Sequence, residues 1–224
     1  MAYLPSYRLK LYRNFKAIDA ADYHGIVRYF ERFEDAINTL DAEEYFDCAL
    51  AYTNALFETG NLGQHVVMSD HLLELVIMQN IETWGGEDIY TQLLFKKAVS
   101  LYKLQEYSKS KHILQELIKI HPSDKWPVIL LRKCLVQQKP TWLWRCRATA
   151  VAFTFLSVAA IALELFVVRP FFLDYYEKAL WVHNLLLGAG VLALCGGEAV
   201  HFWQCHRGAK AFAENMQARK KIPW

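Results

Sequence analysis

The sequence predicts an all-α protein in which an antiparallel array of helices precedes a two-helix transmembrane hairpin. Three observations lead to this prediction. Apolar residues recur at three- and four-residue steps over most of residues 1–140, as on the buried face of a helix. Two apolar runs follow, each matching the roughly 20 residues that cross a bilayer as a helix. Only 10 glycines and 6 prolines occur in 224 residues, which favours long helices over many-stranded sheets.

Residues 1–18 are predicted to form a basic amphipathic helix. Apolar residues recur at helical spacing from Leu4 to Ile18, with Lys10, Arg13 and Lys16 on the opposite face. Such a helix either packs against the helices that follow or lies on an anionic surface.

The segment 19–140 is predicted to be a soluble helical domain. One apolar stripe runs from Tyr23 to Leu40, and a second runs from Tyr45 to Leu56. Further helices are expected over 62–81, 88–104, 107–120 and 126–138. The short polar turns between them imply that neighbouring helices are antiparallel.

Residues 94–122 carry the string LFKKAVSLYKLQEYSKSKHILQELIKIHP, in which Ala98 stands between large apolar residues and a proline ends the unit. This rhythm resembles the tetratricopeptide repeat, a helical hairpin. A weaker match covers 49–72, where His65 replaces the expected small residue. The resemblance implies a divergent array over about residues 22–138.

A tetratricopeptide-like array implies a concave surface, formed by the first helix of each pair, that holds a peptide or a partner helix. The residues at the matching positions form the predicted partner surface. They are Asp47, Asn54 and Glu58 in the first unit, and Gln92, Lys96, Val99, Tyr102 and Lys103 in the second.

Residues 141–206 are predicted to be the transmembrane hairpin, with spans at about 148–168 and 179–203. The first span contains a single formal charge, Glu164, and the second is interrupted by His183, Asn184 and Glu198. Tryptophans flank the spans, as expected for an aromatic belt at the membrane interface: Trp142, Trp144, Trp181 and Trp203.

The polar residues inside the spans are candidate functional groups, because an unpaired charge in lipid is costly. After the hairpin reverses, Glu164 should lie level with His183 and Asn184, and Glu198 level with Thr154 and Ser157. Hydrogen bonding between the two helices is one interpretation, and a proton or ion path is the other. A lone E-x-x-H at Glu198 lacks the second motif that a helical metal site needs.

Ala189, Ala193 and Gly197 recur every four residues and form a smooth stripe on the second span. Such a stripe allows close approach of another helix, either within the hairpin or from a neighbouring subunit.

Basic residues set the predicted orientation. Ten bases flank the spans on the outer sides of the hairpin, five of them in the basic tail 207–224, whereas the connector 169–178 holds two, offset by two acids. Both termini are therefore expected on the cytoplasmic side or its topological equivalent. A bacterial inner membrane is the expected location, with an organellar inner membrane as the alternative.

Charge is sorted along the chain, although the net charge is only +2. Residues 19–95 hold fifteen acids and two bases, whereas residues 96–147 hold twelve bases and three acids. The basic stretch precedes the first span, where anionic headgroups favour it by about 1 kcal/mol per base. The acidic stretch is expected to steer basic partners.

Catalytic signatures are absent from the sequence. It contains no P-loop, dinucleotide fingerprint, nucleophile elbow or zinc-protease motif, and its five cysteines include no C-x-x-C pair. We therefore expect no enzyme activity, cofactor, metal site or nucleic-acid partner. The predicted function is a membrane-anchored interaction subunit or adaptor of a larger hetero- or homo-oligomeric assembly. The alternative is an oligomeric pore or ion path, with the soluble domain as sensor or gate.

Overall fold

A computed structural model describes residues 5–171 and 176–221. Helices dominate these residues, so the predicted all-α class is confirmed. The chain forms two compact units, Met1–Cys134 and Leu135–Trp224. Each unit has its own packing and is described separately.

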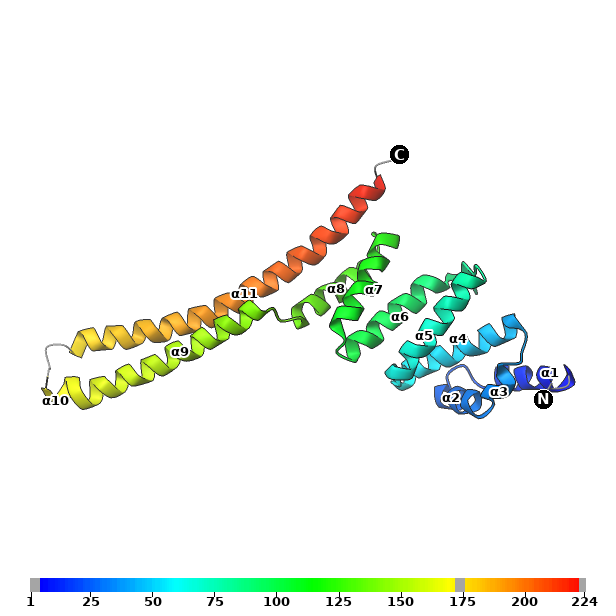
Figure 1. Cartoon of the computed structure of the whole chain (residues 1–224), viewed down its shortest axis with the longest axis horizontal. Coiled ribbons are helices and arrows are strands. Elements are labelled where there is room, and N and C mark those ends of the chain that lie inside the picture. Colours follow the sequence, from blue (N-terminus) through cyan, green and yellow to red (C-terminus); the bar gives the residue numbers. More distant parts are fainter. Residues whose placement is uncertain (1–4, 172–175, 222–224) are drawn as a thin grey trace. The chain divides into compact units, whose positions relative to one another are not determined.

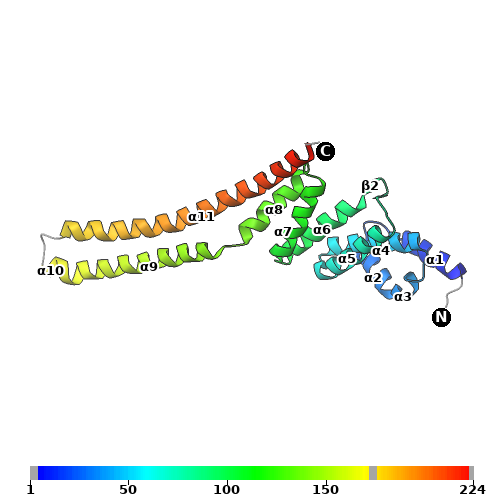
Figure 2. The same cartoon turned by 45° about the horizontal axis from the view of Figure 1, so that its top comes forward.

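Unit 1 is a series of helices in which consecutive long helices pack side by side (Figures 1 and 2). The helices are α1 (Pro5–Lys16), α2 (Tyr23–Arg32), α3 (Glu34–Ile37), α4 (Ala42–Thr59), α5 (Leu62–Met78), α6 (Ile89–Lys103), α7 (Tyr107–Ile120) and α8 (Lys125–Gln137). Between α5 and α6 a two-residue antiparallel ladder pairs β1 (Thr83–Trp84) with β2 (Glu87–Asp88). That ladder is absent from the sequence-based expectation.

Local sequence explains where these helices begin and end. Asp22 and Asp88 accept hydrogen bonds from backbone N–H groups at the starts of α2 and α6. Gly60 ends α4 with φ of 80°, a left-handed conformation that suits glycine. The single stripe expected from Tyr23 to Leu40 divides in two, because the backbone leaves helical geometry at Phe33, with φ of −118°.

The core of unit 1 is built from the predicted apolar stripes, except that the buried face of α2 is rotated about the helix axis relative to the prediction. On α2 the buried residues are Ile26 and Phe30, while Tyr23 is 39% exposed. On α1, Leu11 and Phe15 are buried against α3 and α4. The apolar face of the basic N-terminal helix therefore packs on its own domain; Met1 to Leu4 lie outside the described residues.

Unit 2 contains two long helices that lie side by side (Figures 1 and 2). Its elements are α9 (Thr141–Leu163), the π-helical turn η1 (Glu164–Val168), α10 (Arg169–Phe171) and α11 (Tyr176–Lys221). Part of the expected connector, including Asp174, lies outside the described residues. The segment 207–221, expected to be a tail, continues α11 as helix, because the bases after Trp203 end the apolar run without breaking helical propensity.

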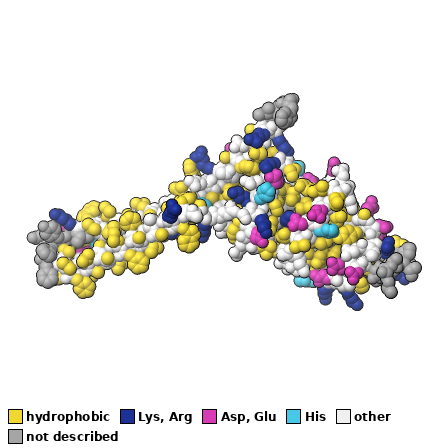
Figure 3. All heavy atoms as spheres, viewed as in Figure 1, with side chains coloured by type: hydrophobic (Ala, Val, Ile, Leu, Met, Phe, Trp, Pro, Cys, Tyr) yellow, Lys and Arg dark blue, Asp and Glu magenta, His cyan; other side chains and the backbone are white. Residues whose placement is uncertain are grey.

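Both long helices are apolar and long enough to cross a membrane. Only 11% of the most apolar window of 141–168, and 17% of that of 180–220, is buried, unlike the core helix of a soluble domain. Figure 3 shows hydrophobic side chains over most of the visible face of the hairpin. Phe155, Phe166 and Leu192 are among the large hydrophobic side chains that are exposed in this unit.

The contact between α9 and α11 follows a seven-residue repeat. Three buried residues of α9, Leu143, Ala150 and Ser157, and the buried Glu164 at the start of η1 each lie seven positions from the next. On α11 the half-buried His183 and the buried Gly190 and Gly197 continue the same interval. A seven-residue interval keeps two helices in register along one seam, which we call the hairpin seam.

Candidate functional site

The predicted partner surface lies on α4 and α6, and we call it the α4–α6 surface. Its acidic end is occupied by the protein's own first helix. Tyr12 on α1 donates a hydrogen bond of 2.9 Å to Asp47 on α4, and the Lys16 ammonium lies 2.7 Å from the same carboxylate. Asp47 is therefore engaged within the unit, whereas Glu58, at the other end of α4, is exposed.

The middle of the α4–α6 surface joins the two helices. Lys96 on α6 donates a hydrogen bond of 2.7 Å to the Asn54 side chain on α4. The Lys96 and Lys103 ammonium groups lie 5.9 and 5.0 Å from the centroid of the Phe57 ring, within the range of cation–π attraction. Lys103 is exposed, so its charge is available to another molecule.

The remaining predicted residues of α6 have local contacts. Gln92 bonds the carboxylate of Glu87 at the β2 turn. Tyr102 packs edge-on against Tyr107 of α7, with ring centroids 5.5 Å apart, and Val99 is half-buried. The exposed chemistry of this surface is thus concentrated at Glu58 and Lys103, close to the shared Phe57 ring.

His65, the residue that departs from the tetratricopeptide pattern, forms a buried polar link. Its Nδ1 lies 2.9 Å from the Ser100 hydroxyl on α6, and its Nε2 lies 3.4 Å from the Ser69 hydroxyl. Burial, with a smaller contribution from the charge of Lys96, lowers the pKa of His65 to about 4. The imidazole is therefore neutral at pH 7, and its hydrogen bonds link α5 to α6.

A second concave site, absent from the sequence-based expectation, lies among α2, α3, α4 and α5. It is an open cavity of about 890 Å³, and we call it the acidic cavity. Its lining includes Phe30, Glu31, Glu34, Tyr45, Tyr52 and His71. Carboxylates, aromatic rings and an imidazole thus converge on one hollow.

Aromatic contacts fix the walls of the acidic cavity. The Phe30 and Tyr52 rings stack with centroids 4.1 Å apart and planes 7° from parallel. The Tyr45 hydroxyl lies 3.0 Å from His71 Nε2, which holds α4 to α5. The Tyr52 hydroxyl donates a hydrogen bond of 3.4 Å to Glu31.

The carboxylates of the acidic cavity act on the pKa values of its two tyrosines. Burial, together with the charge of Glu31, raises the pKa of Tyr52 to about 12. Burial and the charge of Glu34 raise the pKa of Tyr45 in the same direction. The sequence signal for this site was the pair Glu31 and Glu34, one turn apart, but only the fold places it beside two tyrosines from another helix.

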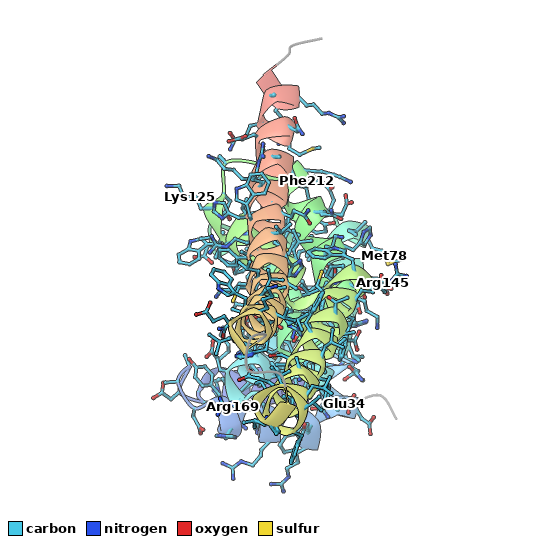
Figure 4. The ribbon with its side chains drawn as sticks, turned by 90° about the vertical axis from the view of Figure 1, so that its left-hand side faces the viewer. Glu34, Met78, Lys125, Arg145, Arg169 and Phe212 are labelled. Carbon is cyan, nitrogen blue, oxygen red and sulfur yellow. The ribbon has the colours of Figure 1, made fainter. Side chains whose placement is uncertain are left out.

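In unit 2 a polar cluster closes the outer end of the hairpin seam. Glu164 is 3% exposed; its carboxylate oxygens lie 3.1 Å from His183 Nδ1 and 3.3 Å from an Arg169 nitrogen. Ser157 donates a hydrogen bond of 3.2 Å to the His183 carbonyl oxygen. Figure 4 looks along the hairpin from the end that carries Arg169. Asn184, expected beside Glu164, is exposed instead.

Glu198 lies at the other end of the seam, away from its expected level with Thr154 and Ser157. It accepts a hydrogen bond of 2.9 Å from Arg147 Nε. Thr154 donates to the Ala150 carbonyl on its own helix, and Ser157 to the carbonyl of His183. The expected level of Glu198 with Thr154 and Ser157 was therefore wrong, because the neighbouring Gly197 packs against Leu143 and Cys146, nearer the start of α9.

The small-residue stripe is centred differently from its expected position. A Cβ added at Gly197 would lie 3.1 Å from Cys146 Cβ, and one at Gly190 would lie 3.3 Å from the Ala150 carbonyl oxygen. Ala189 and Ala193 are half-buried beside this line. The closest approach thus follows Gly190 and Gly197 at a seven-residue interval rather than every fourth residue.

Metal-binding and nucleophilic sites do not emerge from the described residues. Within 5–171 and 176–221, no group of three or more His, Cys, Asp or Glu side chains is placed to hold a metal ion. Cys48 is buried, which raises the pKa of its thiol to about 12 and keeps it protonated.

No known protein family, curated protein or solved structure matches the chain.

Proposed function

We propose that this protein is a membrane-anchored interaction subunit of a larger membrane assembly, recruiting a partner protein through its helical domain. The observation that carries the proposal is the pairing, in one chain, of an exposed apolar helical hairpin with a helical domain bearing charged, aromatic-lined hollows. The hairpin fixes the position of the chain in lipid, and the helical domain supplies the recognition surface.

The hairpin part of the proposal rests on solvation. Leu156, Leu185 and Val191 are among the large apolar side chains exposed on α9 and α11. Burying apolar area contributes about 25 cal/mol per Å², so lipid is the favourable surrounding for these helices. The bases on both outer flanks favour a two-pass topology with both termini on the cytoplasmic side or its equivalent.

The recognition part rests on the helical pairs α4–α5 and α6–α7, which pack side by side, as the hairpins of a tetratricopeptide-like array would. In such arrays the first helices of successive pairs form the binding surface. Here Lys96 joins the two first helices through Asn54, and Lys103 is left exposed over Phe57. Lys103 is therefore the lysine of this surface that we expect to contact the partner.

The test uses the full-length tagged chain, extracted from source-cell membranes in mild detergent. Reversing the charge with Lys103→Glu should reduce co-purifying partner at least tenfold, since like charges juxtaposed across an interface cost several kcal/mol. Lys96 is left unchanged because its ammonium bonds Asn54. Lys119→Glu, an exposed lysine of α7 paired with Glu116, is the matched control.

Thermal unfolding and membrane insertion should be the same for both variants, because exposed charges contribute little to stability. Equal partner recovery from Lys103→Glu and the control would remove this surface from the interface. Absence of any specific partner, together with ion conductance of the purified chain in liposomes, would favour the pore alternative.

A further inference from the structure

The acidic cavity combines the features that recognise a cationic side chain. At about 890 Å³ it lies in the size range of ligand sites, roughly 300–1,000 Å³. Its lining contains Glu31 and Glu34 and neither lysine nor arginine. Among the ion pairs of the described residues, none involves either carboxylate. The cavity thus holds two carboxylates for which none of these ion pairs supplies a cationic partner.

The walls suit the stem and the head of a long basic side chain. The half-buried Tyr45 presents its ring to the cavity, and the largely buried Phe30 and Tyr52 rings add aromatic lining. Aromatic rings attract cations and pack against methylene groups. Val67, 71% exposed on α5, adds apolar surface at the edge. The Phe30–Tyr52 stack holds the rings in place before any ligand arrives.

We propose that the acidic cavity binds a lysine or arginine side chain of a basic, partly apolar segment of a partner protein. Glu31 and Glu34 pair with the cationic head, and the rings with Val67 contact the stem. This inference rests on the proposed function, and it names a second contact point and the chemistry of the partner. An acidic peptide or an anionic lipid headgroup would be repelled by the same carboxylates.

Binding is measured on the full-length protein in nanodiscs of uncharged phosphatidylcholine. The probe is a short fluorescein-labelled peptide of alternating lysine and leucine, followed by fluorescence anisotropy. A peptide with glutamate in place of every lysine should not bind. Empty nanodiscs provide the background for lipid binding.

Two variants test the site by different means. Glu31→Gln with Glu34→Gln removes both charges, and we expect the peptide to bind at least tenfold more weakly. Val67→Arg places a competing cation at the exposed edge, and the same loss should follow. Both sites are exposed, so the fold should persist in circular dichroism.

Matched controls separate local recognition from the general acidity of the domain. Glu43→Gln with Glu82→Gln removes two exposed charges elsewhere in unit 1, and Val67→Leu keeps an apolar side chain; both should bind like the parent. Equal weakening by the Glu43 and Glu82 pair would overturn the site in favour of long-range attraction. Weakening by Glu58→Gln alone would assign the peptide to the α4–α6 surface.

Free lysine amide serves as a competitor of the labelled peptide. If it competes as well as the unlabelled peptide at the same concentration of lysine residues, the cavity binds a small amine, and a partner segment as its occupant is overturned. Peptide binding that survives the cavity variants would overturn the proposal outright. Either result is distinguishable from failure of the proposed function, because partner recovery with Lys103→Glu is measured without the peptide.

Discussion

At the scale of single residues, the buried His65 links two helices and makes the stability of the fold depend on pH. His65 is fully buried, and its ring nitrogens meet the hydroxyls of Ser100 and Ser69. Neutral imidazole satisfies both contacts by donating one hydrogen bond and accepting another. A protonated ring would have two donors, a buried charge and Lys96 nearby, so protonation opposes folding.

The pH dependence of stability follows from this arrangement. The pKa of His65 is lowered from 6.5 to about 4 in the folded state, so the unfolded chain binds the extra proton between these values. Stability from this group is complete above pH 6.5 and falls as the pH drops toward 4, by on the order of 3 kcal/mol. Urea unfolding in detergent, followed by circular dichroism at pH 7 and pH 4.5, measures the loss.

The variant His65→Gln isolates this contribution, because an amide does not titrate. Its stability at pH 7 should be lower than that of the parent, but its further loss on acidification should be smaller. His112→Gln, at an exposed histidine, should retain the parent's pH dependence. An unchanged pH profile in His65→Gln would show that other groups govern acid unfolding.

At the scale of elements, the hairpin seam depends on glycine where the two helices approach most closely. Gly197 faces Cys146 and Leu143 on α9, whereas Gly196, its neighbour in sequence, meets nothing within 4 Å. Adjacent glycines on one helix therefore have different surroundings. Without a hydrophobic force between helices in lipid, such close packing is what holds a hairpin together.

Gly197→Leu should loosen the hairpin, because its Cβ would already lie 3.1 Å from Cys146 Cβ. We expect destabilisation of about 1–3 kcal/mol, as for overpacking of a close-packed contact. Gly196→Leu is the control and should be neutral. Unfolding in mixed micelles at rising dodecyl sulfate fraction compares them. Equal losses would instead assign the exposed glycine to contacts between chains.

Sequence patterns correctly predicted those helices whose ends are marked by turn residues in the sequence. The expected helix 107–120 coincides with α7, and Gly60 ended α4 where the turn was expected. The break at Phe33 was missed because the apolar period continues across it. The end of α11 was misplaced because charge marks the end of lipid contact, not the end of a helix. The hydropathy pattern predicts which residues are helical, whereas the backbone geometry determines where a helix is interrupted.

Of the two polar sites, one could be predicted from the sequence and the other could not. Glu164 and His183 were expected to lie level from the reversal of the hairpin alone, and they lie 3.1 Å apart. The acidic cavity could not be predicted, because Glu31, Tyr52 and His71 come from separate helices whose packing angles the sequence does not specify. Within one hairpin, the positions of two residues along the sequence determine whether their side chains lie close together. Among several packed helices, they do not.

At the scale of the whole molecule, the two units make opposite demands on their surroundings. Unit 1 buries its apolar stripes and carries the acidic stretch, whereas α9 and α11 expose theirs. The proposed membrane location, with lipid around the hairpin and water around the helical domain, would satisfy both demands. α11 spans about 69 Å at 1.5 Å per residue, roughly twice the 30 Å hydrocarbon core, so in the proposed topology its basic end continues beyond the lipid.

Arg207 stacks over the Trp203 ring at 4.5 Å, and Arg147 lies 6.0 Å from the Trp144 ring. Aromatic and basic side chains thus gather where the spans meet the predicted cytoplasmic interface. This arrangement, with ten flanking bases, predicts that the connector faces away from the cytoplasm and both termini face it.

Single cysteines test this topology. Glu177→Cys, on the exposed start of α11, should react in intact cells with a membrane-impermeant maleimide. Arg219→Cys, near the end of α11, should react only after the membrane is permeabilised. The parent chain, labelled in parallel, gives the background from its own thiols, of which Cys48, Cys134 and Cys205 are buried. Labelling of Arg219→Cys in intact cells would place the basic end of α11 outside, contrary to the charge rule.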